Sequence, residues 1–366
     1  MLVTILYVVM LVGAIWVAVA NLPAGLEAWM PLPYMIALIP FLWLPLGAAA
    51  VVAAVAHEWG VMCMLIAVAL ASTTRRSEYW SKSLNPRGGK GGPTAAGASR
   101  GASRETLRET HSGNHDTRET SRETPPSRLN LMTLNCRYGR ADAAQIVREV
   151  RDRHIDVLAL QEVTDDLVAR LDAAGIADLL PHRQSGEPKA ASDNGGYNML
   201  FSALEPAAAV ANVVVIPAAD VPAITLRLAD GRTATIASAH PKSPMRGCRD
   251  WSAGIRGLGA LAGAKHIGDR NIAVVMGDLN SSTDHPSFRA LLGTRGGRGG
   301  TTSGRFRDAS LTQGTGPRLT FPSWLAWPRI ELDHILATPG VAFSGVESFA
   351  VKDTDHLGLT GTITLQ

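Results

Sequence analysis

The sequence predicts an α/β domain at residues 129–366, preceded by a membrane anchor at residues 1–74 and a disordered linker at residues 75–128. The charge distribution is the first observation behind this prediction. The anchor contains no Lys or Arg, the linker contains 11 Lys and Arg against 6 Asp and Glu, and the domain contains 24 of each. The second is that long apolar runs fill only the anchor, whereas short apolar runs and helical patterns alternate in the domain. Because the basic excess lies outside the domain, the charge distribution argues against one soluble basic domain with a nucleic-acid-binding surface.

Three apolar runs predict the anchor. Leu2–Ala20 is uninterrupted and about as long as a bilayer-spanning helix, Leu32–Ala56 is the second run, and Trp59–Ala71 is a shorter third. Prolines interrupt the second run, which membrane helices tolerate better than soluble ones. Residues 32–71 could be one helical hairpin that turns at residues 57–60, so two and three spans both fit the sequence.

Two other interpretations of the first segment are a buried helix of a soluble core and a cleaved signal peptide. Residues 1–74 contain no Lys or Arg, which is very unusual for a soluble protein. Ala18-Val19-Ala20 resembles a cleavage site, but a positive leading region is missing and more apolar sequence follows. The expected location is therefore the cell membrane, with more than one span and the bilayer as a partner.

The linker is rich in Gly, Ser, Thr, Arg and Glu, and Arg-Glu-Thr occurs in it four times. Such a tract cannot bury enough apolar surface to offset the entropy of ordering it, so it is predicted to be a disordered tether. Its first basic residues, Arg75 and Arg76, follow the last apolar run, and the positive-inside rule would keep that side cytoplasmic. The cysteines leave open whether Cys136 and Cys248 pair.

The domain is predicted to contain more strands than helices. Strands are expected at Leu129–Asn135, Ile155–Leu160, Tyr197–Ala203, Ala223–Leu228, Thr233–Ala239, Ile272–Met276, Glu331–Ala337, Val341–Val351 and Leu357–Leu365. Helices are expected at residues 143–153, 164–174, 250–266 and 286–292. Polar residues cluster just past the strand ends, so the site is expected on loops at one edge of the sheets.

The strand-end residues occur in a characteristic order. They are Asn135, Glu162, His240, the Gly277-Asp278-Leu279-Asn280 segment, Asp333, and Asp355-His356. This collection resembles the endonuclease/exonuclease/phosphatase superfamily, and the resemblance covers most of residues 129–366. It implies a four-layer α/β/β/α sandwich of the DNase I type.

Further segments narrow the resemblance. Tyr138-Gly139-Arg140-Ala141-Asp142, the run from Asp156 to Glu162 and the run from Asp284 to Leu292 are similar to an actinobacterial membrane-anchored branch. That branch includes proteins associated with teicoplanin resistance. It implies about three spans, a catalytic domain outside the cell, and dephosphorylation of undecaprenyl pyrophosphate. The outward orientation conflicts with the positive-inside expectation.

The resemblance also implies a metal site. Glu162 is the expected ligand, Asn135 would orient the metal or a phosphate oxygen, and Asp355 would lie near the metal. Because the available ligands are oxygens, Mg²⁺ or Mn²⁺ is expected rather than zinc.

Five residues are expected to be catalytic. The resemblance implies that Asp278 positions or deprotonates the water, that Asn280 binds the transition state, and that His240 donates to a phosphoryl oxygen. His356 would act on the phosphate or as an acid or base, oriented by Asp333.

The leading hypothesis is a membrane-anchored, metal-dependent phosphohydrolase acting on a phosphorylated lipid or similar envelope phosphoester. A membrane-attached nuclease is the alternative, disfavoured because a domain of zero net charge binds phosphate backbones weakly. A catalytically inactive scaffold is a third interpretation, disfavoured because all the expected site residues are present.

Three other motifs are interpreted as structural. Asp284-His285-Pro286 imitates the final Asp-His motif but is expected to start a helix, with Asp284 near its cap. His334 follows Asp333 on a strand and should point to the opposite face of the sheet. The Arg- and Gly-rich residues 295–300 are expected to be a flexible loop.

Overall fold

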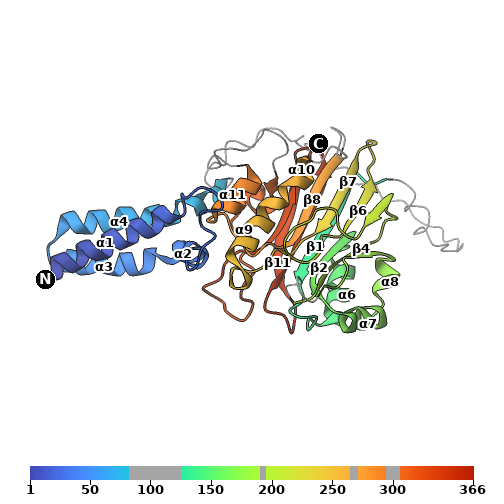
Figure 1. Cartoon of the computed structure of the whole chain (residues 1–366), viewed down its shortest axis with the longest axis horizontal. Helices are drawn as coiled ribbons and strands as arrows, with labels where there is room; N and C mark the ends of the chain where they lie inside the picture. The colour runs from blue at the N-terminus through green and yellow to red at the C-terminus, as the bar shows by residue number, and fades with distance from the viewer. Residues whose placement is uncertain (82–124, 190–194, 264–270, 294–305) are drawn as a thin grey trace, which may run out of the picture.

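The computed structural model of the chain describes residues 1–81, 125–189, 195–263, 271–293 and 306–366 (Figure 1). A helical bundle at the N-terminus projects from a larger α/β domain. Most of the predicted linker, and the loop at residues 295–300, lie outside the described residues.

The bundle consists of α1 (Leu2–Val19), α2 (Leu32–Leu38), η1 (Ile39–Phe41), α3 (Trp43–Val55) and α4 (Trp59–Thr73). Apolar side chains such as those of Ile36 and Leu65 form its interior, yet many exposed side chains, including Ile15 and Val51, are apolar too. Helices that are apolar all round are typical of buried or membrane environments.

One helix among the described residues, α1, is by itself long and apolar enough to cross a membrane. The pair Leu32–Phe41 and Trp43–Val55, bent by 58°, could together make a second span. Helix α4 has only 15 residues. The structure therefore contains an N-terminal helix with the length and composition of a membrane anchor or a signal sequence.

The linker begins later than the sequence predicts. Helix α4 continues into η2 (Thr74–Trp80), which covers residues that the prediction assigned to the disordered tether. Tyr79 is only 2% exposed because it packs against the α/β domain. Composition alone missed this order, since the partners that stabilise the segment lie more than 200 residues away.

The α/β domain contains two six-stranded sheets. The first has the order β11-β12-β1-β2-β4-β3, with β1 (Arg128–Asn135), β2 (Val157–Val163), β3 (His182–Ser185), β4 (Tyr197–Ser202), β11 (Val341–Ala350) and β12 (Leu357–Leu365). The second has the order β5-β6-β7-β8-β10-β9, with β5 (Ala208–Val210), β6 (Ala223–Arg227), β7 (Thr233–Ser238), β8 (Asn271–Asp278), β9 (Arg307–Asp308) and β10 (Asp333–Ala337). Only β1–β2 and β7–β8 are parallel pairs among these strands.

Helices cover the outer face of each sheet. Against the first sheet lie α6 (Ala143–Asp152), α7 (Asp165–Ala173) and α8 (Ile176–Leu179), and against the second lie α9 (Cys248–Gly257), α10 (Gly259–Gly263) and α11 (Pro286–Leu292). The short η3 (Pro244–Arg246) and α12 (Ala309–Gln313) complete the described elements.

Three apolar clusters separate these layers. The central one joins the facing surfaces of the two sheets through residues such as Leu131 and Val274. The outer ones lie between sheet and helices, with Ile146 on one side and Trp251 on the other. This arrangement confirms the predicted four-layer α/β/β/α sandwich.

Helix caps, apolar stripes and proline positions in the sequence explain most of the boundaries of the helices and strands. The stripe of Ile146, Val147 and Val150 buries one face of α6, and Asp142 caps it by accepting a hydrogen bond from the Gln145 amide at 2.9 Å. Helix α11 begins at Pro286, as predicted, with Asp284 two residues before it. All nine predicted strands form, whereas β3, β5 and β9 were not predicted because they are short edge strands without a continuous apolar run.

Candidate active site

The predicted site residues come together because strand ends from both sheets meet at one edge of the sandwich. The parallel pair β1–β2 brings Asn135 level with Gln161, one residue before Glu162. In the second sheet, Asp333 pairs directly with Asp278. A hydrogen bond at 2.9 Å from the Asn135 amide to Asp278 Oδ2 then joins the two sheets.

Asn135 occupies the centre of this arrangement. Its Nδ2 also donates to Glu162 Oε1 at 3.1 Å, and its Oδ1 accepts from the Arg137 backbone amide at 2.9 Å. The other oxygen of Glu162 accepts from the Tyr138 backbone amide at 2.8 Å. The amide of Asn135 therefore fixes two carboxylates relative to each other.

Two histidines face the Asp278 carboxylate. His240 Nε2 lies 3.4 Å from Asp278 Oδ2, and His356 Nε2 lies 3.5 Å from the same oxygen. The other ring nitrogen of His356 is 2.8 Å from Asp333 Oδ2, so this carboxylate is within hydrogen-bond distance of the ring. The ring of Phe321 packs on His356, with centroids 4.9 Å apart.

The electrostatics of the cluster favour an ionised Asp278 and a protonated His356. Burial alone would raise the pKa of Asp278, but the charge of His356 and the hydrogen bond and charge of His240 outweigh it and hold that pKa well below its usual range. Burial alone would lower the pKa of His356, but the carboxylates of Asp333 and Asp278 raise it to about 10.

The backbone of the site is strained at several positions. Arg137, Tyr138, Glu162 and Asn280 all have positive φ values, between 46° and 56°. Residues other than glycine rarely adopt this conformation, although Asn and Asp do so more often than the rest, and it is typically retained at functional sites. At Gly277, with φ of +148°, a Cβ atom would lie 2.0 Å from the Ala239 carbonyl oxygen, so only glycine fits between β8 and the end of β7.

Asn280 and Asp355 are placed less centrally than predicted. The backbone amide of Asn280 donates to Asp278 Oδ1 at 2.8 Å, and its side-chain amide donates to the Pro241 carbonyl at 3.1 Å. Asp355, which was expected near a metal, lies 3.7 Å from the Arg137 guanidinium. Their predicted roles remain predictions.

Two neighbours of the cluster were not predicted. Arg137 pairs with Asp355, and the Tyr138 hydroxyl accepts a hydrogen bond at 3.2 Å from the Arg246 guanidinium. The sequence carried a signal for Tyr138, since it begins the Tyr-Gly-Arg-Ala-Asp segment, but nothing indicated its partner 108 residues away.

The donor set fits a hard divalent cation. A carboxylate oxygen of Asp278 and one of Asp333 lie within 4.8 Å of each other, and Asp333 Oδ1 is buried without a hydrogen-bond partner among the described residues. Glu162 is 13% exposed, so its carboxylate is open to the solvent side while Asn135 and Tyr138 hold it in place. Carboxylate and amide oxygens are the ligands that Mg²⁺ and Mn²⁺ prefer.

A second histidine–carboxylate cluster lies behind the first. His334 points to the opposite side of β10 from Asp333, as predicted, with Nδ1 2.8 Å from Asp308 Oδ2 and Nε2 2.8 Å from the Ser281 carbonyl. Burial alone would lower the pKa of His334, but the hydrogen bond and charge of Asp308 and the charge of Glu331 raise it to about 9.

The three cysteines are unpaired, so Cys136 and Cys248 form no disulfide.

Comparison with known proteins gives a family match and a likeness of fold. Residues 132–356 match the model of the endonuclease/exonuclease/phosphatase family. Among curated proteins, none matches the sequence.

Three solved structures illustrate the likeness. A humanized D. rerio TDP2 with 14 mutations is 15% identical, with a TM-score of 0.50 over 65% of this chain and 99% of that one. An endonuclease/exonuclease/phosphatase from Bacteroides vulgatus is 17% identical, with a TM-score of 0.48 over 65% and 99%. The human Nocturnin catalytic domain with bound sulfate is 19% identical, with a TM-score of 0.46 over 66% and 96%. The likeness to TDP2 supports the fold.

Proposed function

The chain belongs to the endonuclease/exonuclease/phosphatase family, and from that premise we propose that it is a membrane-anchored, metal-dependent hydrolase of a phosphoester or pyrophosphate. The substrate is an envelope lipid such as undecaprenyl pyrophosphate, and the cation is Mg²⁺ or Mn²⁺. The observation that carries the proposal is the joint placement of Asn135, Glu162 and Asp278 around one amide, with two histidines beside them.

The residues of the cluster suit attack by water on phosphorus. Asp278 is held ionised, so its carboxylate can accept a hydrogen bond from the attacking water and orient it. His356 carries a proton on both ring nitrogens at neutral pH, so its Nε2 can donate to a phosphoryl oxygen while Asp333 holds the ring. His240 and Asn280 provide further polar contacts to the same region, and these would strengthen as charge builds up on the phosphoryl oxygens.

Glu162 and Asn135 would hold the cation, and Asp355 would lie near it. When bound, a divalent cation neutralises the charge that develops on the phosphoryl oxygens. The protein's part is to keep Glu162 oriented, which the hydrogen bonds from Asn135 and the Tyr138 amide do.

Membrane attachment is proposed from the apolar bundle. Helix α1 and the bent pair Leu32–Phe41 and Trp43–Val55 would cross the bilayer, with α4 packed against them as a shorter third helix. We place the catalytic domain outside the cell, as the family resemblance implies, although Arg75 and Arg76 favour the cytoplasmic side by charge.

Phosphate release is the test. The full chain, purified in detergent, is incubated with undecaprenyl pyrophosphate and with a generic phosphodiester, each with Mg²⁺, Mn²⁺ or EDTA. We expect metal-dependent release from the lipid that Asp278→Ala abolishes. Release from neither substrate contradicts the proposal. Degradation of DNA or RNA that Asp278→Ala abolishes, without activity on the lipid, would identify a membrane-attached nuclease instead.

A further inference from the structure

The bundle and the α/β domain meet in an interface that contains buried charged groups. Glu27, in the loop after α1, is fully buried. It accepts hydrogen bonds from the Ser287 backbone amide at 2.6 Å and from the Ser287 hydroxyl, and one from the Gly25 amide at 2.6 Å. A buried carboxylate is costly unless hydrogen bonds compensate it. Two of its three donors come from the domain, so Glu27 is satisfied in this position only when the two parts are docked.

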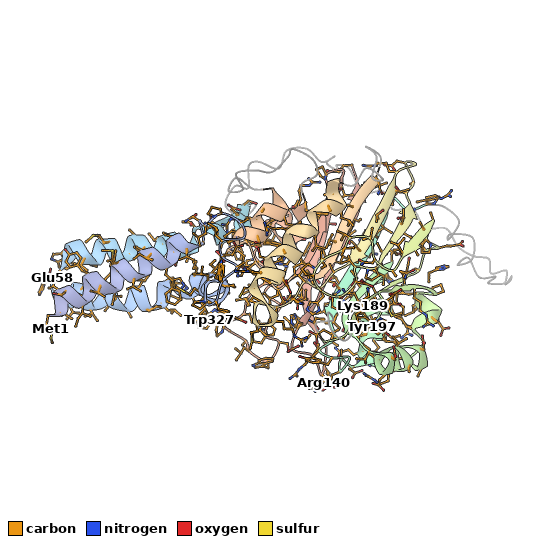
Figure 2. The ribbon with its side chains drawn as sticks, in the orientation of Figure 1. Met1, Glu58, Arg140, Lys189, Tyr197 and Trp327 are labelled. Carbon is orange, nitrogen blue, oxygen red and sulfur yellow. The ribbon has the colours of Figure 1, made fainter. Side chains whose placement is uncertain are left out.

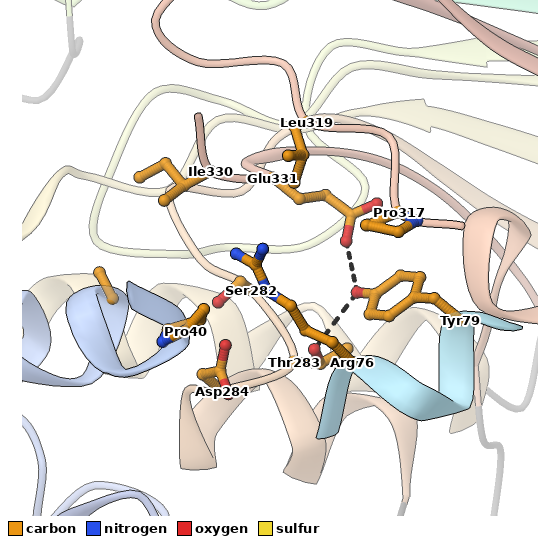
Figure 3. Close-up of a pocket in the computed structure, with 11 residues that line it drawn as sticks. Pro40, Arg76, Tyr79, Ser282, Thr283, Asp284, Pro317, Leu319, Ile330 and Glu331 are labelled. Atoms are coloured by element: carbon orange, nitrogen blue, oxygen red, sulfur yellow. Dashed lines mark hydrogen bonds between the residues drawn. The ribbon is translucent and has the colours of Figure 1, made fainter. Parts of the chain in front are cut away.

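Helix η2 provides a second contact of the same kind. The Tyr79 hydroxyl donates to the buried Glu331 carboxylate and lies 3.2 Å from the Thr283 hydroxyl (Figure 3). The Tyr79 carbonyl accepts from the Gly316 amide at 2.7 Å. A small cavity beside these groups is lined by both parts of the molecule, with Arg76 from the anchor side and Asp284 from the domain side.

A third contact leads from the bundle to the active-site loop. His285 Nε2 lies 3.0 Å from the Pro33 carbonyl, while its Nδ1 accepts from the Ser282 amide at 3.0 Å. Burial lowers the pKa of His285 to about 4, so the ring is neutral and its Nε2–H donates to Pro33. The Trp251 ring packs against His285 at 5.2 Å, and its Nε1 donates to the Asn280 carbonyl at 2.9 Å. Two buried side chains thus connect the anchor to Asn280.

Aromatic contacts extend the interface to both sides of the site. Arg249, at the start of α9, lies over the Trp29 ring at 4.2 Å. Trp327 packs on Phe41 with centroids 5.8 Å apart, in the loop that begins at Phe321 beside His356. Figure 2 shows Trp327 where the bundle meets the domain. The bundle therefore touches the loops on either side of the catalytic cluster.

We propose that the anchor is docked on the α/β domain as part of the catalytic unit. The docked anchor holds the domain at the membrane even without the covalent connection, and it positions the loop that carries Asn280. The hydrogen bonds of Glu27, Tyr79 and His285, together with the aromatic contacts, carry this role. The inference rests on the proposed membrane attachment for its location, whereas the docking itself depends only on contacts within the chain. Residues 82–124 then connect two parts that are already bound to each other.

The experiment cuts the chain between the two parts. A protease site is inserted between residues 100 and 101 of the full chain, membranes containing the protein are treated with protease, and complete cleavage is verified on a denaturing gel. We expect the cleaved domain to sediment with the membranes. In the isosteric double variant Glu27→Gln/Tyr79→Phe, we expect release of the cleaved domain to increase about tenfold, since buried hydrogen bonds to charged groups are lost.

Matched controls use the same residue types away from the interface. Glu58 lies at the far tip of the bundle (Figure 2), and Tyr7 is 46% exposed on α1. The double variant Glu58→Gln/Tyr7→Phe should retain the cleaved domain as the wild type does. Release of the wild-type domain on cleavage, or equal release from both double variants, overturns the docking.

Two further readouts separate the parts of the proposal. If the uncleaved chain fails to sediment, membrane attachment is wrong, and docking is then judged by whether the cleaved fragments coelute in gel filtration. For the positioning role, the Glu27→Gln/Tyr79→Phe variant should lose kcat several-fold with KM near the wild-type value, at a temperature where the domain is folded. An unchanged kcat in a released domain contradicts positioning of the Asn280 loop.

Discussion

The two histidine–carboxylate clusters on β10 begin from nearly the same chemistry. Asp333 and His334 are neighbours that point to opposite sides of the strand. On one side Asp333 pairs with His356, and on the other His334 pairs with Asp308, both at 2.8 Å. All four side chains are buried, and the pKa of each histidine is raised by its carboxylates.

The clusters differ in what the second ring nitrogen faces. His356 Nε2 faces Asp278 at 3.5 Å, beside the groups that could hold a cation. His334 Nε2 instead donates to the Ser281 carbonyl at 2.8 Å, and Tyr79 closes the cluster through Glu331. A buried Asp–His pair is therefore insufficient evidence of catalysis. When both ring N–H groups of the histidine donate to other groups of the protein, no donor is left for a substrate, and the pair can only stabilise the fold.

Substitution of Asp278 should give the largest effect on activity. Asp278→Asn removes the ionised carboxylate proposed to orient the attacking water and should lower kcat/KM by about 10²-fold, the usual effect of misplacing a reacting group. Asp308→Asn, the matched change in the other cluster, should leave kcat/KM within about threefold of wild type in protein that is folded. Phosphate release under saturating Mg²⁺ measures both. Equal losses in the two variants would contradict the distinction between the clusters.

The stability of the second cluster should depend strongly on Asp308. Asp308→Asn leaves the His334 charge buried without its main partner, which should lower the free energy of unfolding by about 3–5 kcal/mol. Denaturant unfolding followed by fluorescence measures the change. Asp333→Asn is the comparison, since it should lower kcat as well as stability. A loss below about 1 kcal/mol for Asp308→Asn would show that the cluster stabilises little.

The pH dependence of stability should distinguish the two histidines. Each pKa is raised on folding, so each proton stabilises the folded state fully below pH 6.5 and the contribution is lost as pH rises toward about 9 for His334 and about 10 for His356. The free energy of unfolding, measured in steps across this range, should therefore fall with pH. His334→Gln should make the slope shallower up to about pH 9, and His356→Gln should make it shallower up to about pH 10. A slope that neither variant changes would contradict both assignments.

The aromatic rings over the two histidines should give the smallest effects. Phe321 packs on His356 at 4.9 Å and Phe288 on His334 at 4.3 Å. Phe321→Leu should lower kcat by about 2- to 10-fold, since an aromatic ring beside a cation contributes about 0.5–1.5 kcal/mol. Phe288→Leu should leave kcat unchanged and lower the unfolding free energy by about 1 kcal/mol. If Phe288→Leu lowered kcat and Phe321→Leu did not, the histidine that takes part in the reaction would be His334 rather than His356.

The sequence indicated where the residues of the candidate site lie along the chain, because strand ends are readable locally. Asn135, Glu162 and Asp278 each end a short apolar run, and parallel pairing brings such ends to one edge. The alternation along β10 also predicted that Asp333 and His334 diverge. The contribution of each side chain to the reaction remains a prediction, since geometry alone does not measure it.

The contacts between bundle and domain could not be predicted from the sequence. Glu27 and Ser287 are separated by 260 residues, and Tyr79 and Glu331 by 252. No local pattern records such pairs, and the composition around Tyr79 favoured disorder. The second cluster was missed for the same reason, since His334 was correctly expected to be structural but Asp308 and Glu331 carried no signal as its partners.

The positive φ values around Glu162 have a consequence for protein engineering. Strained residues of this kind cost about 1–3 kcal/mol each, and a folded domain has only about 5–15 kcal/mol in total. The strain at Tyr138 and Glu162 therefore lowers the free energy of unfolding of the domain by a sizeable fraction. A laboratory selection for heat resistance alone would favour glycine at these positions and enrich robust proteins without activity. A library of this protein should be screened for turnover and heat tolerance together, with the improvements sought in the helices and the outer strands.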